Sequence, residues 1–190
     1  LYLPVFFGAF YALIAILMLG ESGRPTDRER VRDTLARRAS FGSSLNLVAW
    51  ATALVAVDGV EGIRRLQSLY LSDATRAREE LEAVVQALSV HAATEPELRD
   101  PAAEAYAVLL ESHPAIAPSL VHDLMAWRRW DFVERIQQVR ERLDDNPLAT
   151  YALGLYLRTA RAERASGAAS DHQELSKTEL SREPAEEKAR

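Results

Sequence analysis

Residues 73–90 have the sequence DATRAREELEAVVQALSV, and this stretch decides the fold class. Its apolar side chains recur at spacings of three and four, at Ala74, Ala77, Leu81, Val84, Val85 and Leu88. Arginine, glutamate and glutamine residues take the opposite face. This periodicity predicts an amphipathic helix with one buried face. Asp73 is a good residue to cap its start.

The chain that follows this helix predicts four more helices, each bounded by proline, aspartate or asparagine. They are expected from Pro101 to before Pro114, from Pro118 to about Trp127, from Asp131 to Leu143 and from Leu148 to about Ala162. No segment alternates with a period of two for long enough to predict a strand. Residues 58–162 are therefore expected to form an all-α domain, a stack of antiparallel helical hairpins.

Two of these helices suggest a repeat, because Pro114 and Pro147 each follow a short helix–turn–helix. A small–aromatic–Leu–Pro progression is formed by Ala102, Tyr106, Leu110 and Pro114. Residues 73–160 thus resemble a tetratricopeptide-like array of helical hairpins, whose concave face binds partner proteins. The second copy departs from the pattern, since Arg135 and Arg142 stand where small residues are expected. The resemblance assigns no peptide-binding residues.

The N-terminal residues 1–20 carry no charge and consist mostly of Leu, Ile, Val, Phe and Ala. A helix of this length rises about 30 Å, the thickness of the hydrocarbon core of a bilayer. The segment therefore predicts a transmembrane helix. A signal peptide is the competing interpretation, but the apolar run is longer than a usual h-region and no A-x-A site follows it. A buried core helix would rarely be apolar all round.

A second uncharged stretch, residues 39–57, has the sequence ASFGSSLNLVAWATALVAV. It is long enough to cross a bilayer, but its serines, Asn46 and Thr52 make it less hydrophobic than the first stretch. A spanning helix would need a partner for Asn46. Two alternatives stay open: a second transmembrane helix that completes a two-helix hairpin, or a buried or interfacial helix.

Residues 21–38 between these stretches are rich in arginine. Pro25 followed by the capping-box pair Thr26 and Glu29 predicts a short helix there. By the positive-inside rule this connection faces the cytoplasm, matrix or stroma. Arginines at that depth can bind anionic lipid headgroups, and the candidate contacts are Arg24, Arg28, Arg37 and Arg38.

The composition offers no catalytic, cofactor-binding or metal-binding residues. The 190 residues include no cysteine, and the four histidines (His91, His113, His122 and His172) show no metal-binding spacing. P-loop, GxGxxG and GxSxG motifs are absent from the sequence. A net charge of −5 argues against a nucleic-acid binder, which needs a basic face. We therefore expect no enzymatic activity, no cofactor and no nucleic-acid partner.

Two segments are candidate contacts with other proteins. The first is Trp127-Arg128-Arg129-Trp130, because Trp and Arg are enriched where interfaces gain most of their energy. The second is the polar tail, residues 163–190, with Leu175 and Leu180 as small apolar anchors. Alone this tail is expected to be disordered, and order within it would come from partner contacts.

These observations favour a non-catalytic, membrane-anchored accessory subunit of a multi-subunit membrane complex. We expect a respiratory or ATP synthase type of assembly in an inner organellar membrane, with mitochondria preferred, or in a bacterial inner membrane. Its partners would be other subunits and anionic lipids. The alternative is a membrane-anchored, tetratricopeptide-like adaptor that binds peptides or partner proteins.

Overall fold

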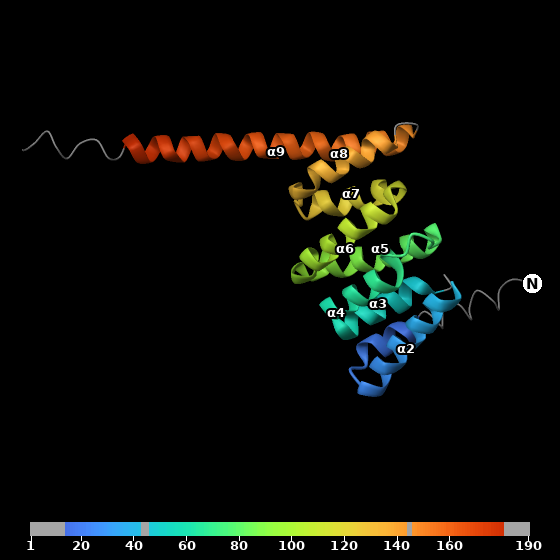
Figure 1. The fold of residues 1–190 in the computed structure, drawn as a ribbon. Helices are drawn as coiled ribbons and strands as arrows, with labels where there is room; N and C mark the ends of the chain where they lie inside the picture. Colours follow the sequence, from blue (N-terminus) through green and yellow to red (C-terminus); the bar gives the residue numbers. More distant parts are fainter. Residues whose placement is uncertain (1–13, 43–45, 144–145, 181–190) are drawn as a thin grey trace, which may run out of the picture.

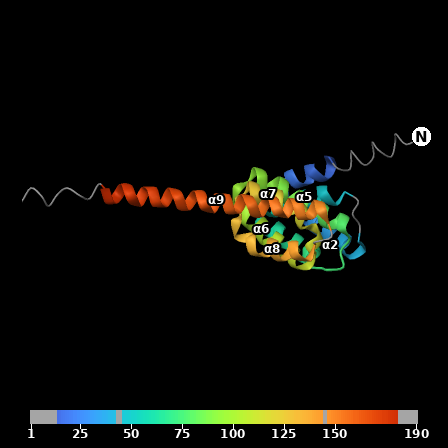
Figure 2. The same cartoon turned by 90° about the horizontal axis from the view of Figure 1, so that it is seen from above.

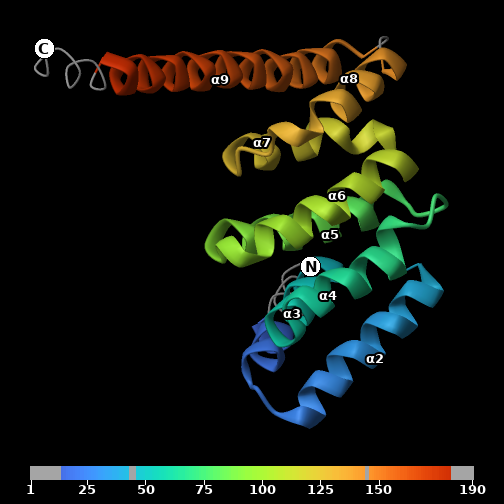
Figure 3. The same cartoon turned by 60° about the vertical axis from the view of Figure 1, so that its left-hand side comes forward.

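The computed structural model describes residues 14–42, 46–143 and 146–180, with side chains described up to residue 166. Every regular element in these ranges is helical, so the all-α prediction is confirmed. Figure 1 shows the helices stacked in chain order, with α2 (Pro25–Phe41) at one end and α9 (Pro147–Leu180) at the other. Figure 3 shows that successive helices form hairpins that pack on one another.

The hairpins are built from short helices joined by tight turns. Between α2 and α9 lie α3 (Leu47–Asp58), α4 (Val60–Leu66), α5 (Arg78–Thr94), α6 (Arg99–Ser112), α7 (Ala117–Ala126) and α8 (Val133–Arg142). A π-helical turn, Gln67–Leu71, continues α4, and 3₁₀ turns at Pro96–Leu98, Pro114–Ile116 and Trp130–Phe132 precede α6, α7 and α8. Along the stack α3 packs on α5 and α7 packs on α9.

The amphipathic helix predicted from residue 73 is α5, and it begins later than expected. Its core face is as predicted, since Leu81, Val84 and Leu88 are buried. Asp73 lies in a turn instead of at the helix start, because its carboxylate accepts hydrogen bonds from the backbone N–H (3.0 Å) and the hydroxyl (2.6 Å) of Thr75. The two alanines assigned to the core face ahead of Leu81 are exposed.

The second apolar stretch, residues 39–57, does not form one helix. Its first residues end α2, where Gly42 takes a left-handed conformation (φ 62°) that favours glycine. The rest belongs to α3, which has 12 residues and buries most of its apolar side chains within the stack. In the part of the chain that the structure describes, no helix is both long enough and apolar enough to cross a membrane. Of the two alternatives for this stretch, the structure shows the buried helix.

The N-terminal apolar segment is described only in part, since residues 1–13 lie outside the described ranges. Residues 14–21 are helical and lie against α3. Ile16 is buried, and a Cβ added at Gly20 would come within 2.9 Å of the Ala53 Cα, so the two backbones are in close contact. The packed body therefore begins well before residue 58, the boundary expected from the sequence.

The arginine-rich connection is a full helix of the stack, α2. It begins at Pro25, with Arg24 at the N-cap and no side-chain cap, so the predicted capping box of Thr26 and Glu29 is not formed. Two of its own side chains, Val31 and Leu35, are fully buried. Its attachment is reinforced by an ion pair between Arg32 and Asp58, the last residue of α3.

The last helix, α9, is much longer than the sequence indicated. It was expected to end near Ala162 with a disordered tail beyond it, but it continues to Leu180. Among its side chains that the structure describes, up to residue 166, Ala160 is the last that is buried. Figures 1 and 2 show its C-terminal half leaving the stack and extending beyond it.

Candidate functional site

An open groove of about 360 Å³ lies between α5 and α7. The lining side chains are Glu82, Val85, Gln86, Ser89 and Val90 from α5, and Ser119, His122 and Asp123 from α7. Val90 is 52% exposed, which is high for a valine inside a folded body. The groove thus combines an apolar wall with acidic and hydroxyl groups.

Asp123 fixes the floor of this groove. Its carboxylate accepts hydrogen bonds from the Ser89 hydroxyl (2.9 Å) and from the Tyr106 hydroxyl (2.7 Å). Tyr106 is fully buried and stacks on Trp127, with ring centroids 5.5 Å apart. Burial, and then the neighbouring carboxylate, raise the pKa of Tyr106 well above its usual value. Asp123 therefore ties α5, α6 and α7 together while one edge faces the groove.

The described side chains of the groove do not assemble a serine nucleophile with its base. Ser89 donates directly to Asp123, and no imidazole lies between them as a nucleophilic serine would require. His122 is 88% exposed and its Nδ1 is 3.8 Å from an Asp123 oxygen. The described residues contain no cluster of three or more His, Asp or Glu side chains placed to hold a metal ion. Val85, Val90, Glu82 and Asp123 together suit an extended peptide with apolar and basic side chains.

The predicted contact segment 127–130 forms the turn between α7 and α8. Trp127 packs on Tyr106, and Trp130 lies against Tyr156 of α9 with ring centroids 5.6 Å apart. Arg128 takes a left-handed conformation (φ 57°), which is uncommon outside glycine, and pairs with Glu163 of α9. Both tryptophans are thus packed within the chain.

Arg129 ties the same turn to two other elements. Its guanidinium contacts Asp100 on α6 and Asp131, each at 2.8 Å. The hydrogen bond from Arg129 lowers the pKa of Asp131. The Arg129 carbonyl accepts a hydrogen bond from the Tyr156 hydroxyl. The segment is therefore a joint that positions α9, and contact of its exposed side chains with a partner stays a prediction.

Leu175 and Leu180, the two candidate contacts of the tail, lie on the part of α9 beyond the stack. The candidate lipid contacts do not form one patch. Arg24 and Arg28 lie at the start of α2, and Arg37 and Arg38 at its end, roughly 20 Å away along a 17-residue helix. The Arg38 guanidinium lies over the Trp50 ring, 5.7 Å from its centroid.

Sequence reasoning missed two groups of residues. One is the Ser89–Asp123–Tyr106 network, which joins three helices and has no signature along the chain. The other is an exposed apolar stripe on α9 formed by Leu148, Tyr151 and Leu155. Its spacing of three and then four was visible in the sequence, beside the separate buried series through Leu153 and Tyr156.

Comparison with known proteins finds no matching family model, no matching curated protein and no matching solved structure.

Proposed function

We propose that the chain is a non-catalytic, membrane-anchored accessory subunit that binds other proteins of a multi-subunit membrane complex. The observation that carries this proposal is the course of α9, which continues to Leu180 after leaving the helical stack (Figure 2). The sequence from residue 163 to 180, ERASGAASDHQELSKTEL, includes Gly167 and few large apolar residues. Isolated helices of such composition are marginal in water. Contact with another chain would supply the missing stabilisation.

The membrane part of the proposal is supported by the N-terminal sequence. Residues 1–20 are uncharged, and residues 14–20 include Gly20, which lies against Ala53 of α3, and the buried Ile16. A membrane anchor attached in this way would hold the stack at the membrane surface. An energy-transducing complex of an inner organellar or bacterial membrane, with mitochondria preferred, is the proposed setting.

A truncation that removes residues 167–190 tests the α9 part. A matched control removes only residues 181–190 and leaves α9 whole. We expect both proteins to stay in membranes after a carbonate wash and to keep the helical content of the stack. On a native gel of detergent extracts, only the longer truncation should lose its place in a large assembly.

Two results would contradict the proposal. One is a protein truncated after residue 166 that co-migrates with the assembly as well as the full chain does. The other is release of the full-length protein by the carbonate wash. This would show that the chain is not anchored in the membrane.

A second function, a membrane-anchored adaptor that captures peptides, is favoured by the groove between α5 and α7. Val90→Lys would place a positive charge on its exposed apolar wall, where it repels basic side chains, without disturbing the buried core. We expect this variant to lose binding of lysine-containing apolar peptides in fluorescence anisotropy. Phe41→Lys, at an exposed apolar residue of α2, is the matched control and should leave such binding unchanged. Equal binding by both variants would exclude the groove.

A further inference from the structure

The outer face of α9 differs from the other surfaces of the stack. Its inner face buries Ala149, Leu153, Tyr156, Leu157 and Ala160. Its outer face exposes Leu148 (81%), Tyr151 (65%) and Leu155 (38%). Residues at these spacings share one side of a helix, so the three side chains form a continuous apolar stripe, here called the α9 stripe.

The position of the α9 stripe makes it unusual. Within the stack α3 is covered by α5 and α7 by α9, whereas no described helix follows α9 (Figure 1). The last helix of a helical array normally presents a polar outer face to solvent. An aligned row of large apolar side chains at that position is typical of a binding surface.

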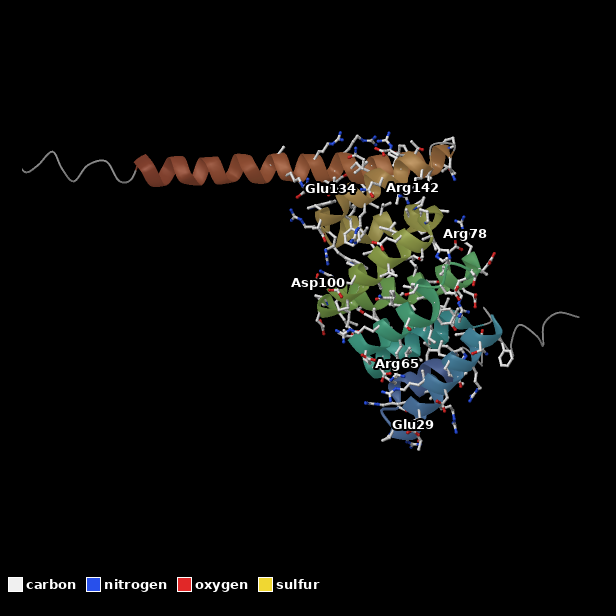
Figure 4. The ribbon with its side chains drawn as sticks, in the orientation of Figure 1. Glu29, Arg65, Arg78, Asp100, Glu134 and Arg142 are labelled. Atoms are coloured by element: carbon white, nitrogen blue, oxygen red, sulfur yellow. The ribbon has the colours of Figure 1, made fainter. Side chains whose placement is uncertain are left out.

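The charges beside the α9 stripe indicate what kind of partner fits. Four exposed arginines of α8 and α9 have side chains that make no ion pair or hydrogen bond within the described residues: Arg140, Arg142, Arg158 and Arg161. Two of them line a cleft of about 270 Å³ between the helices, together with Gln137, Glu141 and Leu157. Figure 4 shows Arg142 beside α9 at this end of the stack.

Several arginines elsewhere in the described part of the molecule are paired with carboxylates, although Arg24 and Arg28 at the start of α2 are not. Arg32, Arg76, Arg128 and Arg129 each lie against a carboxylate. The chain as a whole has a net charge of −5, so a group of exposed arginines without an ion pair among the described residues runs against its general balance. Such a group attracts carboxylates from outside the chain.

We propose that the α9 stripe and its arginines bind an acidic amphipathic helix of another protein, which lies along α9 as the next helix of the stack. The apolar face of the incoming helix would cover Leu148, Tyr151 and Leu155. Its flanking carboxylates would pair with Arg158 and Arg161. The inference rests on the proposed function only in requiring that the chain binds proteins.

The test uses the full chain and two synthetic helical peptides labelled for fluorescence anisotropy. Both peptides carry leucines at spacings of three and four, one with glutamates on the flanks and the other with lysines at the same positions. We expect the glutamate peptide to bind and the lysine peptide to fail. Arg158→Glu/Arg161→Glu should weaken the glutamate peptide about tenfold and allow the lysine peptide to bind.

The controls separate this surface from general stickiness and charge. Leu148→Ser/Tyr151→Ser should weaken the glutamate peptide, whereas Phe41→Ser, a similar change at an 84% exposed residue elsewhere, should not. Arg24→Glu/Arg28→Glu makes the same charge change at the far end of the stack and should have no comparable effect. Circular dichroism confirms that each variant is folded, since all these side chains are exposed.

Three results would overturn the inference. The first is equal binding of the two peptides to the unmodified chain, or binding of neither. The second is an equal loss in the control variants. The third is a dimer in sedimentation velocity that Leu148→Ser/Tyr151→Ser converts to monomer, because the stripe would then bind a second copy of the chain. In each case the retention experiment with truncated α9 still judges the proposed function separately.

Discussion

At the scale of single residues, two buried tyrosines differ in whether the side-chain hydroxyl has a hydrogen-bond partner. The Tyr106 hydroxyl donates to Asp123 at 2.7 Å. The Tyr70 hydroxyl is buried with no hydrogen-bond partner among the described residues, although the Arg76 guanidinium lies 4.9 Å from its ring centroid. Burial raises the pKa of Tyr70 to about 12. An unpaired buried hydroxyl has lost its water without gaining a partner.

Removing each hydroxyl should therefore have opposite effects on stability. We expect Tyr70→Phe to raise the free energy of unfolding by about 1 kcal/mol, because it removes an unsatisfied polar atom. Tyr106→Phe should lower it by about 1 to 2 kcal/mol, because Asp123 loses a donor. Urea unfolding followed by circular dichroism measures both. A change of the same sign in the free energy of unfolding of both variants would contradict the difference in hydrogen bonding between the two hydroxyls.

The ion pair between Arg32 and Asp58 is asymmetric in its burial. The Asp58 side chain is 2% exposed, whereas that of Arg32 is 35% exposed. Asp58 is also the last residue of α3, where the helix dipole disfavours a negative charge. Arg32 donates to both carboxylate oxygens and offsets these costs.

This asymmetry predicts unequal costs for removing the two partners. Arg32→Ala leaves a buried carboxylate without its counter-charge and should cost about 3 kcal/mol of stability. Asp58→Asn keeps the shape of the side chain and leaves an arginine that can turn to solvent. The loss of stability should therefore be roughly half of that in Arg32→Ala. Arg30→Ala is the control, since Arg30 is 66% exposed and 4.0 Å from Asp27. Urea unfolding measures both values. A smaller loss of unfolding free energy in Arg32→Ala than in Asp58→Asn would contradict the prediction.

At the scale of helices, glycine sets how closely α3 and α4 approach. A Cβ added at Gly62 would lie 2.6 Å from the Leu54 carbonyl oxygen, a backbone atom that cannot move aside. A Cβ added at Gly154 of α9 would first meet the Arg158 guanidinium at 3.6 Å, an ordinary contact. The same substitution thus meets very different surroundings in two helices.

Gly62→Ala should destabilise the protein by about 2 to 3 kcal/mol, because the hairpin of α3 and α4 must open. Gly154→Ala should stabilise it by about 0.5 to 1 kcal/mol, because alanine restricts the unfolded chain at no steric cost. Thermal unfolding of the two variants gives both values. Stabilisation by Gly62→Ala would show that the two backbones are not in close contact.

The helices themselves were largely predictable from sequence, but their ends and surroundings were not. The core face of α5 follows from local spacing, whereas its start was missed because Asp73 bonds to Thr75 in a turn. The buried state of α3 depends on the helices around it, so its hydrophobicity alone left a membrane span open. The groove was not predictable, because Ser89, Tyr106 and Asp123 meet only after α5, α6 and α7 have packed.

At the scale of the whole molecule, stability comes from contacts between neighbouring helices in a row. Arrays of this kind open in parts, at the junctions where neighbouring elements are least tightly joined. The groove separates α5 from α7, and the hydrogen bond from Ser89 to Asp123 crosses this junction. Helix α6 stays in contact with the end of α7 through Tyr106, which stacks on Trp127.

This geometry predicts that α7, α8 and the packed part of α9 open together while α3 and α5 stay folded. In native-state hydrogen exchange their amides should share an opening free energy that is lower than that of the α3 amides. Ser89→Ala removes one bond across the junction and should speed exchange in α7–α9 by a few-fold without changing α3. Ser119→Ala is the control, because Ser119 lines the same groove and its side chain makes no hydrogen bond within the described residues. Exchange that accelerates equally in α3 and α8 would mean that the stack unfolds as one unit.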